Sequence, residues 1–319
     1  MLDLQRYNPR VINLVLTKEC AKLCSFCFTG DYSKGTEMSL DYIDRFLTRF
    51  SSSLSYLNVL GGEPTQHRNF PQIIEKIEEH KINYTLISNL LFSQQTLEFI
   101  LKNSQGRLGI SANGMELFKK GNRFKVFKKN YNALYTAFKH IPEYSTLLSL
   151  TVDKNSTPES FKKYISTLKN ELESLPSFRI GLDLSNTGIA NNTLLGDIIR
   201  AIQEASPTSK ILFDCQVPPC IFNYDPNKEL YSFQGLSFSC PGPTLDVFYD
   251  GSAIHCYQAQ KIKINNVFDF YTTRELENEL TRQYKEREET IDILEVCKSC
   301  AHYLEKRCAS LCMGCYQKA

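Results

Sequence analysis

Short apolar segments alternate with longer amphipathic segments over the first two thirds of the chain. Six apolar segments are rich in Val, Ile, Leu, Tyr and Phe, and they cover residues 11–17, 55–61, 83–88, 106–111, 146–152 and 178–184. Nearly continuous apolar runs of this length are typical of parallel strands that are buried on both faces. The pattern therefore predicts six strands of a parallel sheet.

The segments between these strands carry the start signals of helices. Ser39 and Thr157 precede two of the helical patterns as N-cap residues, and Pro71 falls in the first turn of another. Strand–helix repeats imply right-handed βα units, and six of them are too few to close an eight-stranded barrel. We therefore expect an α/β fold in which residues 1–207 form an open, partial (β/α)6 TIM-like barrel.

The pattern changes near residue 207. Residues 205–210, ASPTSK, have the composition of a linker, and residues 208–319 contain nine of the twelve cysteines. This part also has several turn signals and one long polar helical pattern over roughly 273–295. We expect residues 208–319 to be a smaller, cysteine-rich domain that is organised by bound metal rather than by a hydrophobic core.

Composition excludes several classes of protein. The chain has 42% hydrophobic residues, 23% charged residues and a net charge of +2, so no strong field favours nucleic acid or an anionic membrane. It lacks an apolar stretch of membrane-spanning length and a signal-peptide core, which predicts a cytoplasmic protein. Twelve cysteines are too many for a reducing compartment unless they bind something, because disulfides would require export.

Three cysteines, Cys20, Cys24 and Cys27, follow the first predicted strand. A structural zinc site usually needs four ligands, and the next cysteine in the chain is distant. A [4Fe–4S] cluster that is held by three thiolates keeps one iron open for a substrate or cofactor. The loop would lie at the carboxyl end of a parallel sheet, where the active sites of βα folds are found.

Polar and small residues follow the next strands at the same end of the sheet. Gly61-Gly62-Glu63-Pro64 comes after the second strand, where two glycines permit a close approach and Glu63 offers a carboxylate to an ammonium group. A simple strand-end turn is the alternative for this stretch. Later strands end in small polar residues that could equally be turn or N-cap residues, namely Ser88, Asn89, Ser111, Asn113 and Asp153.

These motifs resemble the radical SAM superfamily, whose cysteine loop reads C-x3-C-x2-C with an aromatic residue, here Phe26, before the last cysteine. The GGEP stretch is similar to the superfamily's GGE motif. The resemblance implies that S-adenosylmethionine (SAM) binds the open iron and is reductively cleaved to a 5′-deoxyadenosyl radical, which takes hydrogen from a substrate. It also implies a flavodoxin- or ferredoxin-type electron donor. The residues implied to contact SAM are Phe26, Gly61, Gly62, Glu63, Pro64, Ser88, Asn89, Ser111 and Asn113, with Arg123 or Lys120 as candidates for its carboxylate.

The second group of cysteines begins around a predicted hairpin. Cys240 and Cys256 flank a turn signal at Asp250-Gly251, and five more cysteines follow between residues 297 and 315. Seven or eight thiolates suit two four-ligand centres, and CxxC pairs are also typical of zinc. The metal is therefore open on spacing alone.

This group resembles a SPASM domain, which implies two auxiliary [4Fe–4S] clusters and three clusters in all. One auxiliary cluster would use Cys240, Cys256 and Cys312, with Cys220 or, as the second choice, Cys215. The other would use Cys297, Cys300, Cys308 and Cys315. Two spacings differ from the family pattern, so the division of cysteines between the clusters stays open. His255 is either a ligand or a surface residue.

The SPASM resemblance implies that the substrate is a ribosomally made peptide or protein, modified by a crosslink, epimerisation or oxidation. Only ten residues precede the first strand, so a separate leader-binding protein is one way to recruit a peptide. Two alternatives are a radical SAM dehydrogenase of a small-molecule precursor and a non-catalytic iron–sulfur or zinc protein. No general base is identified, and Asp153, Asp183 and Tyr84 are candidates only by position.

Overall fold

The structure is a computed structural model of the 319-residue chain. It describes residues 11–20, 24, 27, 36–104, 108–113, 122–140, 146–152, 156–175, 177–182, 192–207, 209–213, 245–254, 262–288 and 295–305.

Six parallel strands form the centre of one sheet, as the apolar pattern predicts. They are β1 (Val11–Val15), β2 (Tyr56–Leu60), β3 (Asn83–Ser88), β4 (Leu108–Asn113), β5 (Thr146–Val152) and β6 (Ser177–Leu182). Each pairs with the next in sequence order, which is the arrangement that right-handed βα units produce. Their carboxyl ends therefore meet at one edge of the sheet.

The sheet continues beyond the six predicted strands on both sides. β7 (Ile211–Phe213) adds in parallel to β6, and β8 (Leu245–Val247) adds in parallel to β1. β9 (Ala253–Ile254) and β10 (Lys263–Ile264) follow β8 in antiparallel pairing. The hairpin predicted near residue 250 is confirmed, and it belongs to the same ten-stranded sheet as the barrel strands.

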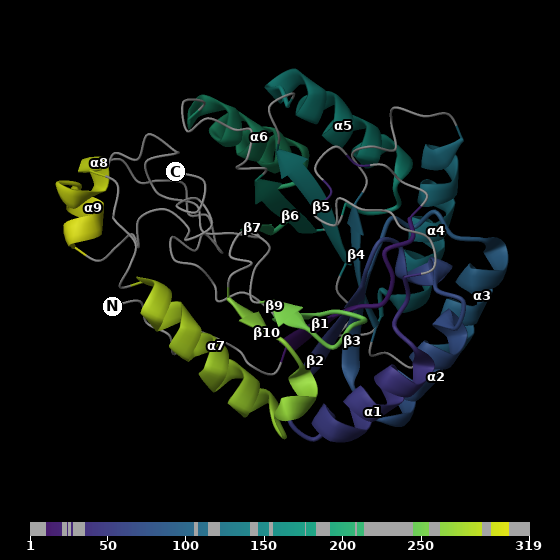
Figure 1. Ribbon diagram of the computed structural model, residues 1–319. Helices are drawn as coiled ribbons and strands as arrows, with labels where there is room; N and C mark the ends of the chain where they lie inside the picture. Colours follow the sequence, from purple (N-terminus) through teal and green to yellow (C-terminus); the bar gives the residue numbers. More distant parts are fainter. Residues whose placement is uncertain are drawn as a thin grey trace.

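Six helices cover the outer face of the sheet (Figure 1). They are α1 (Leu40–Phe50), α2 (Phe70–Glu79), α3 (Gln94–Asn103), α4 (Arg123–Phe138), α5 (Pro158–Glu171) and α6 (Asn192–Ala205). The predicted caps are confirmed, since the Ser39 hydroxyl accepts from the Tyr42 N–H and Thr157 forms a capping box with Ser160. The main hydrophobic core lies between these helices and the sheet.

The two faces of the sheet differ in polarity. On β1, Ile12 and Leu14 are buried among core residues, whereas Asn13 between them points to the inner face because side chains alternate along a strand. Asn13 stands in register with Asn58 of β2 and with Asp246 of β8. Polar groups therefore line the inner face near the middle of these strands.

The segment after β10 packs against α1 of the barrel and against the residues that follow this helix. It contains a 3-10 helix, η6 (Val267–Asp269), and then α7 (Thr273–Glu288). The Arg45 guanidinium lies 3.7 Å from the centre of the Phe268 ring, and the Thr273 hydroxyl donates to the Ser53 carbonyl at 3.2 Å. These contacts join elements more than 200 residues apart in sequence.

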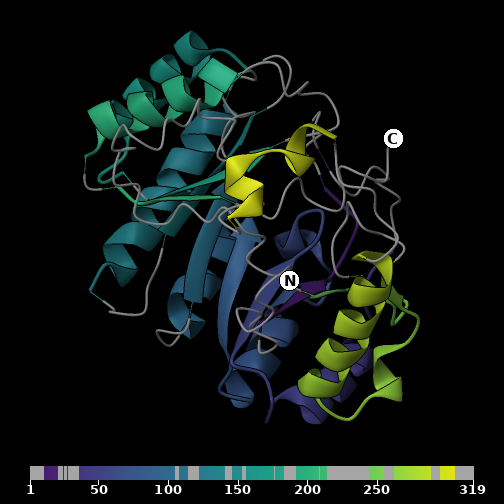
Figure 2. The same cartoon turned by 90° about the vertical axis from the view of Figure 1, so that its left-hand side faces the viewer.

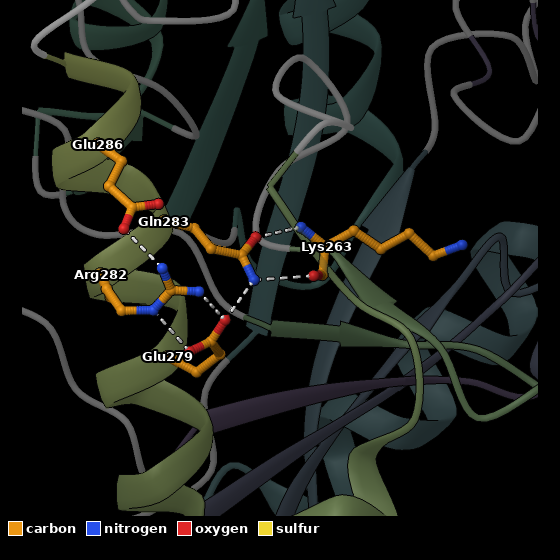
Figure 3. Close-up of polar contacts among 5 residues, drawn as sticks. All are labelled: Lys263, Glu279, Arg282, Gln283 and Glu286. Carbon is orange, nitrogen blue, oxygen red and sulfur yellow. Dashed lines mark hydrogen bonds and ion pairs between the residues drawn. The ribbon is translucent and has the colours of Figure 1, made fainter.

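A side-chain amide on α7 covers the edge of β10 (Figure 3). The Lys263 N–H donates to Gln283 Oε1 at 2.9 Å, and Gln283 Nε2 donates to the Lys263 carbonyl at 3.0 Å. Gln283 Nε2 also donates to Glu279 Oε1 at 2.8 Å, which fixes the orientation of the amide. The amide thus occupies the hydrogen-bonding groups that a further strand would use.

Two short helices, α8 (Glu295–Lys298) and α9 (Ala301–Leu304), lie on the opposite side of the molecule from α3 and α4 and face the viewer in Figure 2. Within the described residues, no helix is long and apolar enough to cross a membrane.

Candidate functional site

The two ends of the cysteine loop are tied together at the carboxyl end of β1. The Met38 N–H donates to the Leu16 carbonyl at 2.7 Å, and the Lys18 N–H donates to the Thr36 carbonyl at 3.2 Å. Thr17 and Glu37 form an antiparallel bridge between these bonds. The loop that carries the three cysteines therefore starts and finishes on a short two-stranded base.

The glycines of the GGEP stretch allow this base to approach the end of β2. The Gly62 N–H donates to the Thr17 carbonyl at 2.6 Å, and the Glu63 N–H donates to the Glu19 carbonyl at 2.8 Å. A Cβ atom on Gly62 would lie 2.3 Å from the Glu19 carbonyl oxygen, and one on Gly61 would lie 2.5 Å from that of Thr17. Side chains are excluded at both positions because the backbone before Cys20 occupies the space.

The Glu63 side chain is buried beneath this contact and is 2% exposed. Its Oε1 accepts from Thr65 N at 3.3 Å, Thr65 Oγ1 at 2.7 Å and Ser88 Oγ at 2.8 Å, and its Oε2 accepts from Asn89 N at 2.8 Å. Burial raises the pKa of Glu63, and these four hydrogen bonds oppose that rise. The carboxylate therefore connects the end of β2 to the end of β3.

Asn89 connects the end of β3 to the cysteine loop. Its Nδ2 lies 3.9 Å from Cys20 Sγ, within the range of a weak N–H···S hydrogen bond. Its Oδ1 accepts from the Leu91 N–H at 2.8 Å in an Asx-type turn. Two of the residues predicted to lie together, Glu63 and Asn89, are therefore in direct contact, and Asn89 also reaches the first cysteine.

His67 fixes the GGEP stretch to the far end of the cysteine loop. The side chain is buried, its Nδ1 accepts from the Asn69 N–H at 3.0 Å, and its Nε2 lies 2.8 Å from the Met38 carbonyl. Because a backbone N–H can only donate and a carbonyl can only accept, His67 is the neutral tautomer with its proton on Nε2. The neighbouring Arg68 pairs with Glu37, the bridge partner of Thr17.

The donor set of the loop fits an iron–sulfur cluster. Cys20, Cys24 and Cys27 are half-buried thiols outside any disulfide, and the Cys27 N–H donates to the Cys24 carbonyl at 3.2 Å in a tight turn. Thiolates in a loop with a nearby amide donor are the ligands that such clusters use. Among the described residues, no three His, Cys, Asp or Glu side chains form a site for a single metal ion.

A second polar group lies on the inner face of the sheet, and the sequence analysis did not identify it. Asn13 Nδ2 donates to Asp246 Oδ1 at 2.5 Å, and Asn13 Oδ1 accepts from Asn58 Nδ2 at 2.7 Å. Burial raises the pKa of Asp246 to about 7, although the Asn13 hydrogen bond and the charge of Arg179 act in the opposite direction. The available sequence signal was an asparagine inside each of two apolar strands.

Several other candidates lie apart from this site or outside the described residues. Tyr84 is buried on the helix-facing side of β3, with its hydroxyl 3.4 Å from Ser104 Oγ, and Arg123 is the first residue of α4. Ser111 and Asn113 lie in the last half of β4, but the structure does not describe their side chains. The candidates outside the described residues are Phe26, Lys120, Asp153, Asp183, Cys215, Cys220, Cys240, His255, Cys256, Cys308, Cys312 and Cys315.

Two C-terminal cysteines are described. Cys297 lies in α8 and Cys300 is the N-cap residue of α9, and both are half-buried and outside any disulfide. The Cys300 N–H donates to the Cys297 carbonyl at 3.1 Å, which repeats the turn seen at Cys24 and Cys27. The CxxC pair therefore has the same local backbone hydrogen bond as the pair in the N-terminal loop.

The chain is similar to known proteins in part of its sequence and in its fold. Residues 14–170 match the model of the radical SAM superfamily. The fold is similar to Streptococcus suis SuiB bound to S-adenosylmethionine, with a TM-score of 0.61 and 15% identity over 92% of this chain and 71% of that chain. For SuiB bound to precursor peptide SuiA, the TM-score is 0.57 with 14% identity, over 78% of this chain and 59% of that chain. No curated protein sequence gives a significant match.

The elevated pKa of Asp246 predicts a pH-dependent stability. A carboxyl with a pKa of 3.8 in the unfolded chain and about 7 in the folded one binds more protons when folded, so stability is full below pH 3.8 and falls as the pH rises to about 7. The cost at pH 8 is about 4 kcal/mol at most. We expect Asp246→Asn to raise the urea midpoint at pH 8, and to raise it about half as much at pH 5.5, because the unfolded carboxyl is already ionised there.

The exposed Asp269→Asn is the matched control for Asp246→Asn, and it should change neither midpoint. An equal effect of Asp246→Asn at both pH values would contradict the assignment of the titration to Asp246.

The hydrogen bonds of Glu63 predict a second effect on stability. Glu63→Gln keeps the shape of the side chain but replaces one acceptor oxygen by a donor, so it leaves at least one buried N–H or O–H unpaired. We expect a loss of about 1–3 kcal/mol in the free energy of unfolding, measured by urea denaturation. The exposed Glu75→Gln on α2 is the control, and an equally small change in both variants would contradict the bridging role of Glu63.

Proposed function

Because residues 14–170 of this chain are a domain of the radical SAM superfamily, we propose that the protein binds SAM at a [4Fe–4S] cluster held by Cys20, Cys24 and Cys27. When bound, these cofactors supply one-electron cleavage of SAM and a 5′-deoxyadenosyl radical that takes hydrogen from a substrate. The observation that carries the proposal is the packing of the cysteine loop against the GGEP turn through the bonds Gly62 N–Thr17 O and Glu63 N–Glu19 O.

The chain's own residues hold and orient this site. The base of the cysteine loop is fixed by β1 and by Met38, and the contact of Asn89 with Cys20 adds a side-chain donor beside the first ligand. The expected contacts of the GGEP stretch with the methionine part of SAM remain part of this proposal. Backbone carbonyl groups would carry these contacts, since Thr65, Ser88 and Asn89 engage the Glu63 carboxylate and the N–H groups of Gly62 and Glu63 bind the chain's own backbone.

The substrate that we propose is a ribosomally made peptide or protein. Two observations support it: the similarity of the fold to SuiB, which is bound to precursor peptide SuiA in one structure, and the likeness of the C-terminal cysteines to a SPASM domain. This chain spans 59% of SuiB in that structure. The modification is a hydrogen abstraction that leads to a crosslink, epimerisation or oxidation.

The inner face of the sheet is the surface that we propose for the substrate. Asp246 is the one carboxyl among the described residues that lies there in register with polar side chains on both β1 and β2. Its pKa of about 7 would let it give or accept a proton near neutral pH. The C-terminal segment would thus contribute a proton-transfer group to the barrel through β8.

The C-terminal cysteines would hold two auxiliary [4Fe–4S] clusters. The proposal keeps Cys240, Cys256 and Cys312 for one and Cys297, Cys300, Cys308 and Cys315 for the other, with Cys220 or Cys215 as a further ligand. The turn at Cys297 and Cys300 supports a shared metal centre, because its hydrogen bond brings the backbones of the two cysteines of one CxxC pair close together. Saturated clusters of this kind would carry electrons.

Replacement of a cysteine in the loop tests the SAM site. We expect the anaerobically reconstituted protein to hold about twelve irons in three clusters, and Cys24→Ala to hold about eight. The variant should keep its far-UV circular dichroism, because the loop supplies ligands rather than core residues, and it should form no 5′-deoxyadenosine with dithionite. Retained 5′-deoxyadenosine would remove the loop from the reaction.

A C-terminal double variant tests the auxiliary clusters. Cys300→Ala with Cys315→Ala should also hold about eight irons, but it should still cleave SAM with dithionite because the N-terminal loop is intact. Iron content and 5′-deoxyadenosine are measured in the same preparation, with Cys24→Ala as the reciprocal control. About four irons together with stoichiometric zinc in the wild-type protein would overturn the auxiliary clusters and leave the SAM site standing.

A further inference from the structure

Asn89 is placed to act on the first cysteine of the loop. It follows β3, whereas Cys20 follows β1, so the side chain reaches past the end of β2 to the sulfur. Asn89 is 7% exposed, and Nδ2 lies 3.9 Å from Cys20 Sγ. This is a contact between residues 69 positions apart in sequence.

The orientation of the Asn89 amide follows from its second contact. The Leu91 N–H donates to Oδ1 at 2.8 Å, and a backbone N–H cannot accept a hydrogen bond. The oxygen of the amide must therefore face Leu91, and the NH₂ group must face Cys20. A flipped amide would place two donors against each other at Leu91 and an oxygen against the sulfur.

Three side chains, those of Glu63, Ser88 and Asn130, form hydrogen bonds to the backbone of the turn that contains Asn89. The Asn89 N–H donates to Glu63 Oε2 at 2.8 Å, and the next N–H, that of Leu90, donates to Ser88 Oγ at 3.0 Å. Asn130 of α4, itself buried, donates from Nδ2 to the Leu90 carbonyl at 2.8 Å and to the Phe92 carbonyl at 3.1 Å. Each of these bonds fixes a different part of the turn.

This turn also contains backbone strain. Leu90 has a φ of 56°, in the left-handed region that residues other than glycine seldom adopt, and its side chain is fully buried. Such a conformation is unfavourable and persists only where the surroundings determine it. The strain therefore indicates that the position of residues 88–91 is imposed by their contacts rather than by local preference.

From this geometry we infer that Asn89 donates an N–H···S hydrogen bond to Cys20 in the loaded protein and raises the reduction potential of the cluster. The inference rests on the proposed cluster. A reduced cluster carries one more negative charge, so a donor to one of its sulfurs stabilises the reduced form more than the oxidised form. Asn89 acts through Cys20, as a positioning and tuning residue.

The substitution Asn89→Asp removes the donor and keeps the turn, but it adds a negative charge. It keeps an oxygen that can accept from the Leu91 N–H, so the turn is retained, but it removes the NH₂ group that faces Cys20. Asn89→Leu removes the donor without adding a charge. Asn83→Asp is the matched control, since Asn83 is exposed at the opposite end of the same strand, about 20 Å from Asn89.

The readout is the midpoint potential of the cluster in an anaerobic titration followed by EPR. The signal that belongs to the loop is the one that Cys24→Ala abolishes. We expect Asn89→Leu to lower the equilibrium constant for reduction about threefold to tenfold, which is about 30–60 mV for one electron, and Asn89→Asp to lower it further. Asn83→Asp should match the wild type.

A second measurement needs no variant at Asn89. Wild-type protein labelled with ¹⁵N only in asparagine side-chain amides should show a ¹⁵N coupling to the reduced loop cluster in pulsed EPR. An unchanged potential in both variants, or the absence of this coupling, would overturn the inference while the cluster itself stands. If Cys24→Ala instead kept all of its iron and its EPR signal, the proposed function would be wrong.

Discussion

The site depends on one buried carboxylate that accepts four hydrogen bonds. Removing Glu63 from water is costly unless donors replace the water, and Thr65, Ser88 and Asn89 supply them. Thr65 is local to the carboxylate, but Ser88 and Asn89 belong to the end of another strand. Because the Glu63 carboxylate needs these donors, the last residues of β3 take a fixed position relative to the turn after β2. This position also places Asn89 beside Cys20.

Backbone contacts complete what this carboxylate begins. Gly61 and Gly62 have no side chain that would separate the turn from the stretch Thr17–Glu19. The N–H groups of Gly62 and Glu63 therefore reach the carbonyl oxygens of this stretch. These bonds extend the pairing of β1 and β2 beyond the regular strands. The residues before Cys20 are therefore fixed to the carboxyl end of the sheet.

The sequence predicted the strands and caps well because their signals are local. Continuous apolar runs located β1 to β6, and single residues such as Ser39 and Thr157 marked helix starts. It did not predict that β7 and β8 join the same sheet, because strands of three residues have no periodicity and their partners are distant in sequence.

The sequence predicted where the candidate residues lie in the fold, but it did not predict their hydrogen-bond partners. The GGEP stretch and Ser88-Asn89 were recognised at strand ends, and the structure brings them together. Their interactions could not be read from spacing, because a carboxylate that binds a ligand and one that binds its own backbone have the same sequence. Gly61 and Gly62 likewise permit the close approach of the chain's own backbone. From the sequence alone, the approach of a ligand was an equally good explanation for them.

The pairing of β8 with β1 makes residues 245–247 part of the same sheet as the strands of the barrel. Asp246 reaches the inner face only because β8 runs parallel to β1 in the register Asn13–Asp246, and a shift by one residue would turn the carboxyl to the other face. The segment after β10 is fixed again by Thr273 and by the stacking of Arg45 on Phe268.

A buried carboxyl with a pKa near 7 destabilises the fold, whereas an asparagine there would keep the bond to Asn13 without the charge. The fold thus carries a cost on the inner face, and the proton transfer proposed for Asp246 would account for keeping a carboxyl there.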